Sequence, residues 1–389
     1  MYIRHIWYVT TSNLLSTFLA FFSFGILAKS LNFKDFGFYI LLISLATLAA
    51  DLIDFGSGLH IIIASRNLDG AASRRILRRN LEIKISFMLC LLPAVLILSI
   101  IFRNYYISLC YIMSVLFFLR NNCLTTCRAL DKTQTYGSII LFERVIFLLF
   151  VFFIPGNLIT FLLVQIFSLG MSIFSAQRKG ITTLCKPTGP KAILSNFRKS
   201  VQLGLGSALS NVNLIFPILI GALFGFTVLA EYGLLVKTLL PLQIVGSSFA
   251  MLRVKYDLPK YLGYSKRPLI QLSQFLVLGL MLLGLMYLLP MIISLFTDSR
   301  YIYSHLQIAL VILIVLCQQL LSYITAGLQT LQRFNFINST LLLFILCYTT
   351  SLYFFSFIQN LNTILLIELC LTAILTFAYV FYSRGRLNA

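Results

Sequence analysis

The chain has 389 residues, of which 59% are hydrophobic and only 11% are charged, and it carries a net charge of +19. Because about a quarter of the residues in soluble domains are charged, this composition excludes a soluble globular protein. In lipid, only helices and closed barrels satisfy every backbone polar group. The apolar stretches are continuous over about 20 residues, so we predict an all-α polytopic membrane protein of about 12 transmembrane helices.

Twelve apolar stretches, taken in chain order, are the predicted spans. Six precede the longest polar connection, and they are Tyr8–Ala28, Phe36–Ile63, Ile83–Phe102, Tyr105–Cys127, Ser138–Ile154 and Leu158–Ala176. Six follow it, near residues 201–224, 232–252, 269–289, 304–324, 337–357 and 361–381. The sequence therefore predicts an N-terminal six-helix bundle over residues 1–176, a cytoplasmic linker over 177–200 and a C-terminal six-helix bundle over 201–389.

The lysines and arginines between spans lie almost entirely on one side. Twenty-three of them lie at the termini or in loops that follow even-numbered spans, and four lie on the opposite side, namely Lys29, Lys34, Arg103 and Arg300. The positive-inside rule makes the first side cytoplasmic, so we predict that both termini are cytoplasmic. This topology explains the net positive charge without a nucleic-acid partner, and the loops lack the aromatic residues of a nucleic-acid site.

The chain resembles itself at an offset of 196 residues. Gly25 falls on Gly221, and Asp35-Phe36-Gly37 falls on Glu231-Tyr232-Gly233. An acidic residue suits a helix N-terminus, where its charge meets the positive end of the helix dipole, and a glycine permits close approach of a neighbour. One interpretation is a six-span unit repeated once, as in many transporters. The alternative is that two helix starts resemble each other by chance.

Motifs of the common enzyme chemistries are absent from the sequence. It contains no G-x-x-x-x-G-K-[ST] loop of an ATPase, and no H-E-x-x-H, G-x-S-x-G or metal-spaced His/Cys cluster. An enzyme that acts on sugars at the outer surface would need a larger platform than the short predicted outer loops. The sequence therefore predicts movement of a substrate rather than its conversion, with no cofactor and no metal site.

Three basic residues fall inside predicted spans, and they are Arg120, Arg144 and Lys237. A charge at the bilayer centre costs at least about 2.5–3.5 kcal/mol on insertion scales, so these side chains should face an aqueous cavity or a partner. The guanidinium fork and the ammonium group both suit phosphate oxygens. One interpretation is thus a cationic cavity for an anionic headgroup such as a pyrophosphate. The alternative is internal ion pairing, with Glu143 neutralising Arg120 or Arg144.

Other polar residues inside spans extend this candidate site. Asn13 and Asn211 lie in the first and seventh spans, and with Glu143 they complete the predicted cavity set. Hydrogen bonding between helices is the alternative for both asparagines. Glu368, in the last span, and Asp54, near the end of the second, are candidates for coupling to an ion or a proton. For Asp54 the alternative is solvation at a helix end.

The segment Ile26–Gly56, ILAKSLNFKDFGFYILLISLATLAADLIDFG, resembles the start of Wzx-type O-antigen and polysaccharide flippases. These belong to the MOP exporter superfamily, together with MATE drug exporters and lipid II flippases. The features that carry the resemblance are an acidic–Phe-Gly-x-Tyr step from Asp35 to Tyr39 and a D-x-G-like end at Asp54 and Gly56. The six-plus-six plan extends the resemblance to the whole chain. Unlike lipid II flippases, the chain has no extra pair of spans.

The resemblance implies two six-helix bundles around a central cationic cavity that works by alternating access. The implied substrate is an undecaprenyl-pyrophosphate-linked oligosaccharide, the O-antigen repeat unit, moved from the cytoplasmic to the periplasmic leaflet of a bacterial inner membrane. A polysaccharide polymerase and a chain-length regulator are the implied protein partners. The alternatives are a MATE-like ion-coupled drug exporter, which would favour an acidic cavity, and an O-antigen polymerase or glycosyltransferase, which would need a sizeable outer loop.

Overall fold

The computed structural model describes residues 2–54, 70–130, 132–154, 156–181, 212–238, 300–330, 334–358 and 360–387, with five residues between 290 and 297. All regular secondary structure in these residues is helical. Eight helices are long and apolar enough to cross a membrane, and two shorter apolar helices accompany them. The chain is therefore an all-α, multi-pass membrane protein, as the composition predicts.

The first six predicted spans correspond to six helices. These are α1 (Tyr2–Ser30), α2 (Phe33–Asp54), α4 (Gly70–Ile101), α5 (Tyr105–Ala129), α6 (Thr133–Phe153) and α7 (Leu158–Arg178). Helix α4 begins at Gly70, well before the predicted start at Ile83. Hydropathy marks only the apolar part of a helix, whereas the basic turns that precede it are also helical.

The C-terminal helices cover parts of the later predicted spans. These are α9 (Val212–Phe224), α10 (Phe226–Thr238), α13 (His305–Thr330), α14 (Phe334–Phe355) with the 3₁₀ turn η4 (Ser356–Ile358), and α15 (Leu361–Leu387). The predicted ninth span, residues 269–289, lies outside the described residues. The total of twelve spans therefore remains a prediction.

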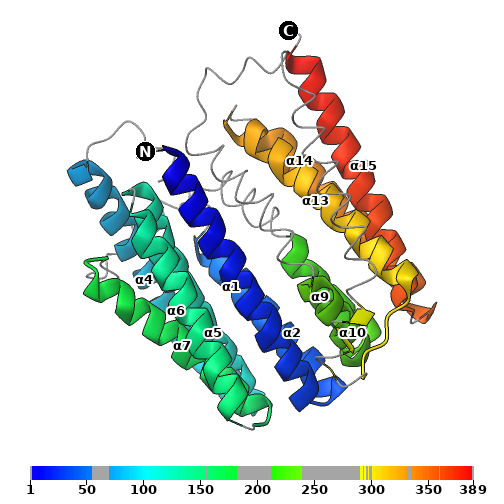
Figure 1. Cartoon of the computed structure of the whole chain (residues 1–389), viewed down its shortest axis with the longest axis horizontal. Helices are drawn as coiled ribbons and strands as arrows, with labels where there is room; N and C mark the ends of the chain where they lie inside the picture. Colours follow the sequence, from blue (N-terminus) through cyan, green and yellow to red (C-terminus); the bar gives the residue numbers. More distant parts are fainter. Residues whose placement is uncertain are drawn as a thin grey trace.

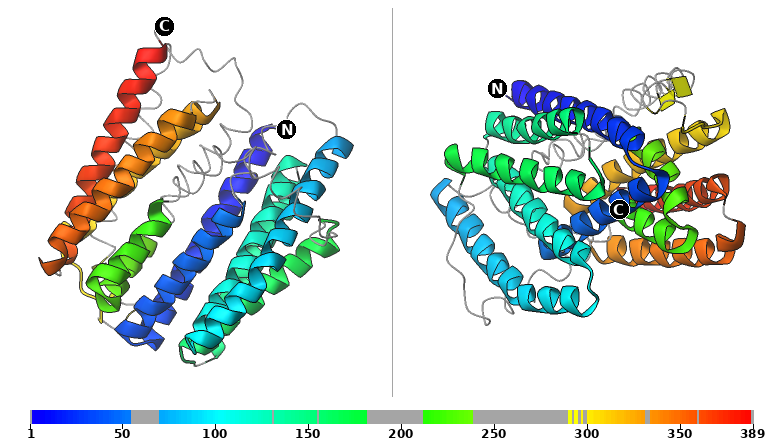
Figure 2. Two further views of the ribbon diagram at one scale, coloured as in Figure 1. Left: turned by 180° about the vertical axis from the view of Figure 1, so that it is seen from behind. Right: turned by 90° about the horizontal axis from the view of Figure 1, so that it is seen from below.

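The helices fall into two groups in space (Figure 1 and Figure 2). Helices α1 to α7 lie on one side and α9 to α15 on the other, and we call these groups the N half and the C half. Both termini lie at one end of the molecule, the terminal end, and the turn between α1 and α2 lies at the opposite, distal end. The charge pattern predicts that the terminal end is cytoplasmic. The bundle boundaries at 176 and 200 remain predictions, because most of the linker lies outside the described residues.

Helix α2 begins with a reciprocal cap. The Asn32 side-chain oxygen accepts a hydrogen bond from the Asp35 backbone N–H at 2.7 Å, and the Asn32 amide donates to the Asp35 carboxylate at 2.9 Å. This arrangement satisfies one backbone donor of the first turn and places a negative charge beside the positive end of the helix dipole. The acidic residue that the sequence pattern places at this helix start therefore has a local structural role.

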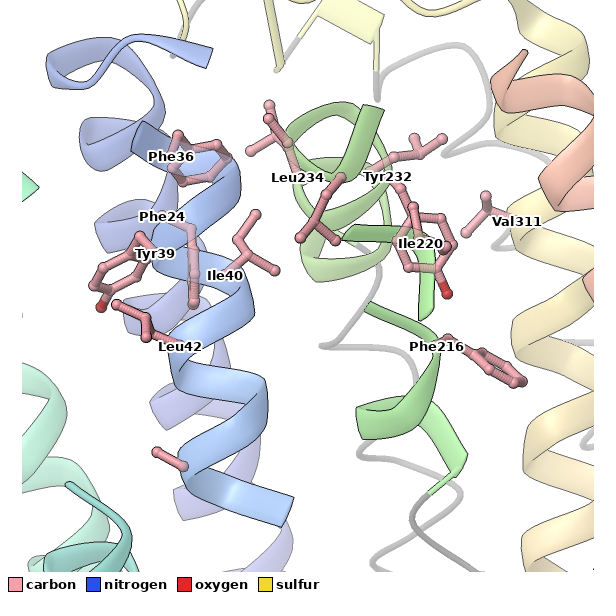
Figure 3. Packing of buried hydrophobic residues seen from close by; sticks show 14 of the residues in the cluster. Phe24, Phe36, Tyr39, Ile40, Leu42, Phe216, Ile220, Tyr232, Leu234 and Val311 are labelled. Carbon is pink, nitrogen blue, oxygen red and sulfur yellow. The ribbon is translucent and has the colours of Figure 1, made fainter. Parts of the chain in front are cut away.

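The two halves share one hydrophobic core at the distal end (Figure 3). In it, Phe36 and Ile40 of α2 lie beside Leu234 of α10, and the core continues through Ile220 of α9 to Val311 of α13. Helix α2 packs against both α9 and α10. The packing of α2 on the C half thus joins the two groups of helices through buried apolar side chains.

Two glycines permit this packing. A Cβ atom on Gly37 would overlap the backbone carbonyl of Phe226, and one on Gly233 would collide with the side chain of Ile40. Gly37 and Gly233 are the residues that the 196-residue offset places on each other. In each half, therefore, the repeated glycine is a position where the opposite half approaches closely.

Candidate functional site between the two halves

Three charged groups meet in the middle of the N half. Arg120 of α5 donates from Nε to Glu143 Oε2 of α6 at 2.7 Å, and Arg144 Nη2 lies 3.9 Å from Glu143 Oε1. The Glu143 side chain is 0% exposed, whereas those of Arg120 and Arg144 are 16% and 23% exposed. The structure thus brings together three predicted site residues, and Glu143 is the shared counter-ion of both arginines.

The cluster lies deep in the bundle. Glu143 is ten residues from each end of α6, or about 15 Å at the helical rise. The hydrocarbon core of a bilayer is about 30 Å thick, so a helix that spans it places this carboxylate near the midplane. At this depth, charges persist only beside partners or water.

Arg144 is only partly satisfied by Glu143. Its Nε atom is buried without a hydrogen-bond partner, and its guanidinium approaches the carboxylate no closer than 3.9 Å. The charge of Arg144 also acts on Lys237 of α10 and on Tyr39 of α2. Arg144 is therefore within electrostatic reach of Lys237 in the other half, with donor capacity left over.

Lys237 reaches the same boundary from the C half. Its ammonium nitrogen lies 5.7 Å from the ring centroid of Phe24 on α1, within the range of a cation–π contact. Helices α1 and α10 contact each other. Two cations, one from each half, are therefore within electrostatic reach of each other between α6, α1 and α10.

Asn13 belongs to a second network. The Tyr136 hydroxyl donates to Asn13 Oδ1 at 3.2 Å, and Arg128 Nη2 donates to the Tyr136 oxygen at 2.8 Å. Arg128 also lies over the Tyr136 ring, 4.9 Å from its centroid. This network joins α1, α5 and α6 in the last turns of α5, toward the terminal end. The other predicted asparagine, Asn211, lies outside the described residues.

Asp54, a predicted coupling residue, is paired with Lys84 of α4. The Lys84 ammonium donates to Asp54 Oδ1 at 2.5 Å and to the Asp54 backbone oxygen at 2.6 Å. The charge count places Lys84, at the start of the predicted third span, with the basic residues of the cytoplasmic side, but the structure buries it in α4, which begins fourteen residues earlier. The pair links α2 to α4.

Glu368 is buried in the C half. Its carboxylate accepts hydrogen bonds from the Tyr232 hydroxyl of α10 at 2.9 Å and from the Gln318 amide of α13 at 3.2 Å. Sequence reasoning does not predict that Tyr232 and Gln318 are its partners, because neither is near Glu368 in the chain. The repeated acidic–aromatic–glycine step does contain Tyr232, but it marks this residue as part of a helix start and not as a partner of Glu368.

Tyr39 and Phe24 also border the region around Arg144 and Lys237, and the predicted site set lacks them. Tyr39 is fully buried in α2, with its hydroxyl 3.5 Å from Gln165 Oε1 of α7. Tyr39 is the last residue of the acidic–Phe-Gly-x-Tyr step, so the motif identifies it. Its place near Arg144 follows only from the fold. Phe24 has no such signal, because the chain contains 35 phenylalanines.

The charge balance of the cluster predicts a stability effect. Replacing Glu143 by glutamine leaves two partly buried arginines without their counter-ion, and breaking a buried pair in this way costs about 3–5 kcal/mol. We expect Glu143→Gln to lower the thermal unfolding temperature of the detergent-solubilised protein. The matched control is Glu82→Gln, which breaks the exposed Arg78–Glu82 pair in α4 and should cost less than about 1 kcal/mol. Equal losses in the two variants would contradict a role of Glu143 as buried counter-ion.

Solved structures with the same fold are MATE and MOP superfamily transporters. The chain superposes over 99% of its length, and 96% of theirs, on a point mutant of a MATE transporter with a TM-score of 0.67 and on a MOP superfamily transporter from Pyrococcus furiosus with a TM-score of 0.66. For an inward-facing multidrug resistance MATE family transporter, the superposition covers 98% of each chain with a TM-score of 0.66. Sequence identity is 12% in all three comparisons.

These likenesses concern the fold. They extend over almost the whole of each chain, so the similarity is to the transporter fold as a whole rather than to one of its halves. No protein-family model and no curated protein sequence matches the chain. The function of the chain must therefore be argued from the residues between the halves.

Proposed function

We propose that the chain is a flippase that moves an undecaprenyl-pyrophosphate-linked oligosaccharide, such as an O-antigen repeat unit, across a bacterial inner membrane. The anionic headgroup and its sugars enter a cationic cavity between the halves from the cytoplasmic side. The lipid tail stays in the bilayer. The cavity then opens to the periplasmic side by alternating access.

The observation that carries this proposal is the pair of intramembrane cations from opposite halves. Arg144 has unsatisfied donor capacity and lies within electrostatic reach of Lys237. Holding two like charges near each other in a low-dielectric region is unfavourable unless an anion joins them. A pyrophosphate offers several acceptor oxygens, which suit the planar guanidinium and the point charge of the ammonium group.

The same charges oppose a cationic substrate. Glu143 pairs with Arg120 and Arg144, and Lys237 lies within electrostatic reach of Arg144, so these four side chains together carry two positive charges. A cationic drug would be repelled from this region. The Pyrococcus furiosus transporter is described as having a binding pocket of reverse polarity that suggests a different function, so pocket polarity is a reasonable guide to the substrate within this fold.

Alternating access fits the fold. Solved structures of a multidrug resistance MATE family transporter with the same fold are described as inward-facing and outward-facing. A ligand that binds cations from both halves has different contacts in the two states, because the distance between the halves changes. Such differential binding is what allows a ligand to shift a conformational equilibrium.

A direct test is transport by the purified protein in liposomes. The probe is a radiolabelled undecaprenyl-pyrophosphate-linked oligosaccharide, and the matched control is the same oligosaccharide on a polyprenol without phosphate. We expect faster movement between leaflets for the pyrophosphate probe only, relative to protein-free liposomes. Equal movement of both probes, or of neither, would contradict a site that selects the anionic headgroup.

A further inference from the structure

The step Glu231-Tyr232-Gly233 in α10 contacts three different parts of the structure through three consecutive residues. The Glu231 backbone carbonyl accepts a hydrogen bond from the Tyr303 hydroxyl at 2.8 Å. The Tyr232 hydroxyl donates to the buried carboxylate of Glu368 at 2.9 Å. Gly233 lies against Ile40 of α2, which belongs to the other half. A single turn of helix therefore connects a buried acid to the contact between the halves.

The surroundings of Glu368 are neutral in the part of the chain that the structure describes. Tyr232 of α10 and Gln318 of α13 donate to its two carboxylate oxygens, and Tyr348 of α14 is within electrostatic reach. Tyr232 and Gln318 stabilise the carboxylate through hydrogen bonds from uncharged groups. A charge in such a site is costly inside a membrane, so binding of a proton or a monovalent cation there removes a large unfavourable energy.

Two further hydroxyls near this acid lack partners. The Tyr348 hydroxyl and the Thr372 hydroxyl, one helical turn beyond Glu368 on α15, are both buried without a hydrogen bond. Buried polar atoms without partners are rare and costly. Each of these hydroxyls can accept a hydrogen bond from a protonated carboxyl group or coordinate a monovalent cation. Two buried hydroxyls, one on α15, the helix of Glu368, and one on its neighbour α14, are therefore without hydrogen-bond partners.

We infer that neutralisation of Glu368, by a proton or a monovalent cation, is transmitted through Tyr232 to the Gly233–Ile40 contact and loosens the distal closure between the halves. Tyr232 is thus a positioning residue for α10. The inference rests on the alternating access of the proposed function, but it does not depend on the identity of the substrate. The residues that connect ion binding at Glu368 to opening of the distal end are then Glu231-Tyr232-Gly233, the second copy of the repeated acidic–aromatic–glycine step.

The physical reason lies in the strength of one hydrogen bond and the tightness of one contact. A hydrogen bond to a charged carboxylate is about twice as strong as one to a neutral carboxyl. Neutralisation therefore weakens the hydrogen bond between Tyr232 and Glu368 of α15, or turns the Glu368 carboxyl group toward Tyr348 and Thr372. Because Gly233 contacts Ile40 without room for a methyl group, a small shift of α10 disturbs the contact between the halves.

The test measures distances across the distal end. Spin labels are placed on Cys residues introduced at Lys34 of α2 and Thr227 of α10, both exposed, in a background without native cysteines, and no lipid-linked sugar is present. With the Glu368 side chain neutralised we expect the ratio of open to closed populations to rise about fivefold, the effect of changing a charge-assisted hydrogen bond to a neutral one. An acidic buffer free of sodium and an alkaline buffer rich in sodium distinguish the proton from the cation.

Three variants test separately the neutralisation of Glu368, its transmission through Tyr232 and the loss of an unrelated buried hydroxyl. Glu368→Gln should open the distal end under all conditions, and Tyr232→Phe should remove the response to pH or sodium. The matched control is Tyr379→Phe, which removes a buried hydroxyl that contacts Thr340 within the same half and should respond as the original protein does. The inference would be overturned if the original protein keeps the closed distances in both buffers, or if Tyr232→Phe responds fully. Neither result bears on the choice of substrate, which the liposome assay tests separately.

Discussion

Replacing Arg144 by alanine is expected to reduce transport of a pyrophosphate-linked substrate by at least about 30-fold, since truncating one partner of a buried charge pair costs about 2–5 kcal/mol. Arg144 has a buried Nε without a hydrogen-bond partner and lies within electrostatic reach of Lys237 in the other half. The measurement is the rate of movement of the labelled lipid in liposomes that contain equal amounts of folded protein.

Two comparisons separate recognition from folding. Arg144→Lys keeps the charge but loses the planar fork, so it should retain part of the rate. Arg103→Ala, in the exposed turn between α4 and α5, removes a basic residue outside the site and should leave transport unchanged. If Arg144 and Lys237 bind the same headgroup, the effects of removing both will not add. Full transport by Arg144→Ala would refute the assignment of this arginine to the substrate.

The second large effect is expected at Gly37. A Cβ atom there would overlap the backbone carbonyl of Phe226, and a backbone atom cannot rotate away as a side chain does. Overpacking of this kind costs about 1–3 kcal/mol or more. We therefore expect Gly37→Ala to lower the thermal unfolding temperature and to weaken distal closure. Spin labels at Lys34 and Thr227 should report longer distances in this variant.

The matched control for Gly37 is Gly170 in α7. A Cβ atom on Gly170 would meet no atom within 4 Å. Alanine in a helix interior is more favourable than glycine by about 0.5–1 kcal/mol, so Gly170→Ala should leave the unfolding temperature unchanged or raise it slightly. A similar loss of stability in both variants would contradict the close approach of α2 to the C half.

Most of the N-terminal helices could be predicted from hydropathy because each span is a continuous apolar run. The prediction failed at the start of α4, where basic residues continue the helix beyond the apolar region. The charge count also placed Lys84, at the start of the predicted third span, with the basic residues of the cytoplasmic side, whereas the structure pairs this residue with Asp54. Hydropathy measures the affinity of single residues for lipid, so it does not reveal a buried ion pair between two helices.

The candidate site was predicted only in part. The cost of a charge in lipid identified Arg120, Arg144 and Lys237 as residues that need a partner or water. It could not decide between ion pairing and substrate binding, because the answer depends on which helices are neighbours. The structure shows that Glu143 is the close partner of Arg120, while Arg144 has a buried Nε without a partner and lies within electrostatic reach of Lys237 in the other half.

The sequence by itself determined the helical class, the predicted side of the basic loops and the residues whose charge is out of place in a membrane. These follow from transfer energies of single residues, which depend on chemical type and local order along the chain. Only the tertiary structure decided that Gly37 and Gly233 lie where the halves meet, and that Tyr232 joins Glu368 to that contact. Such pairings arise from packing between residues more than a hundred positions apart, and no local pattern contains them.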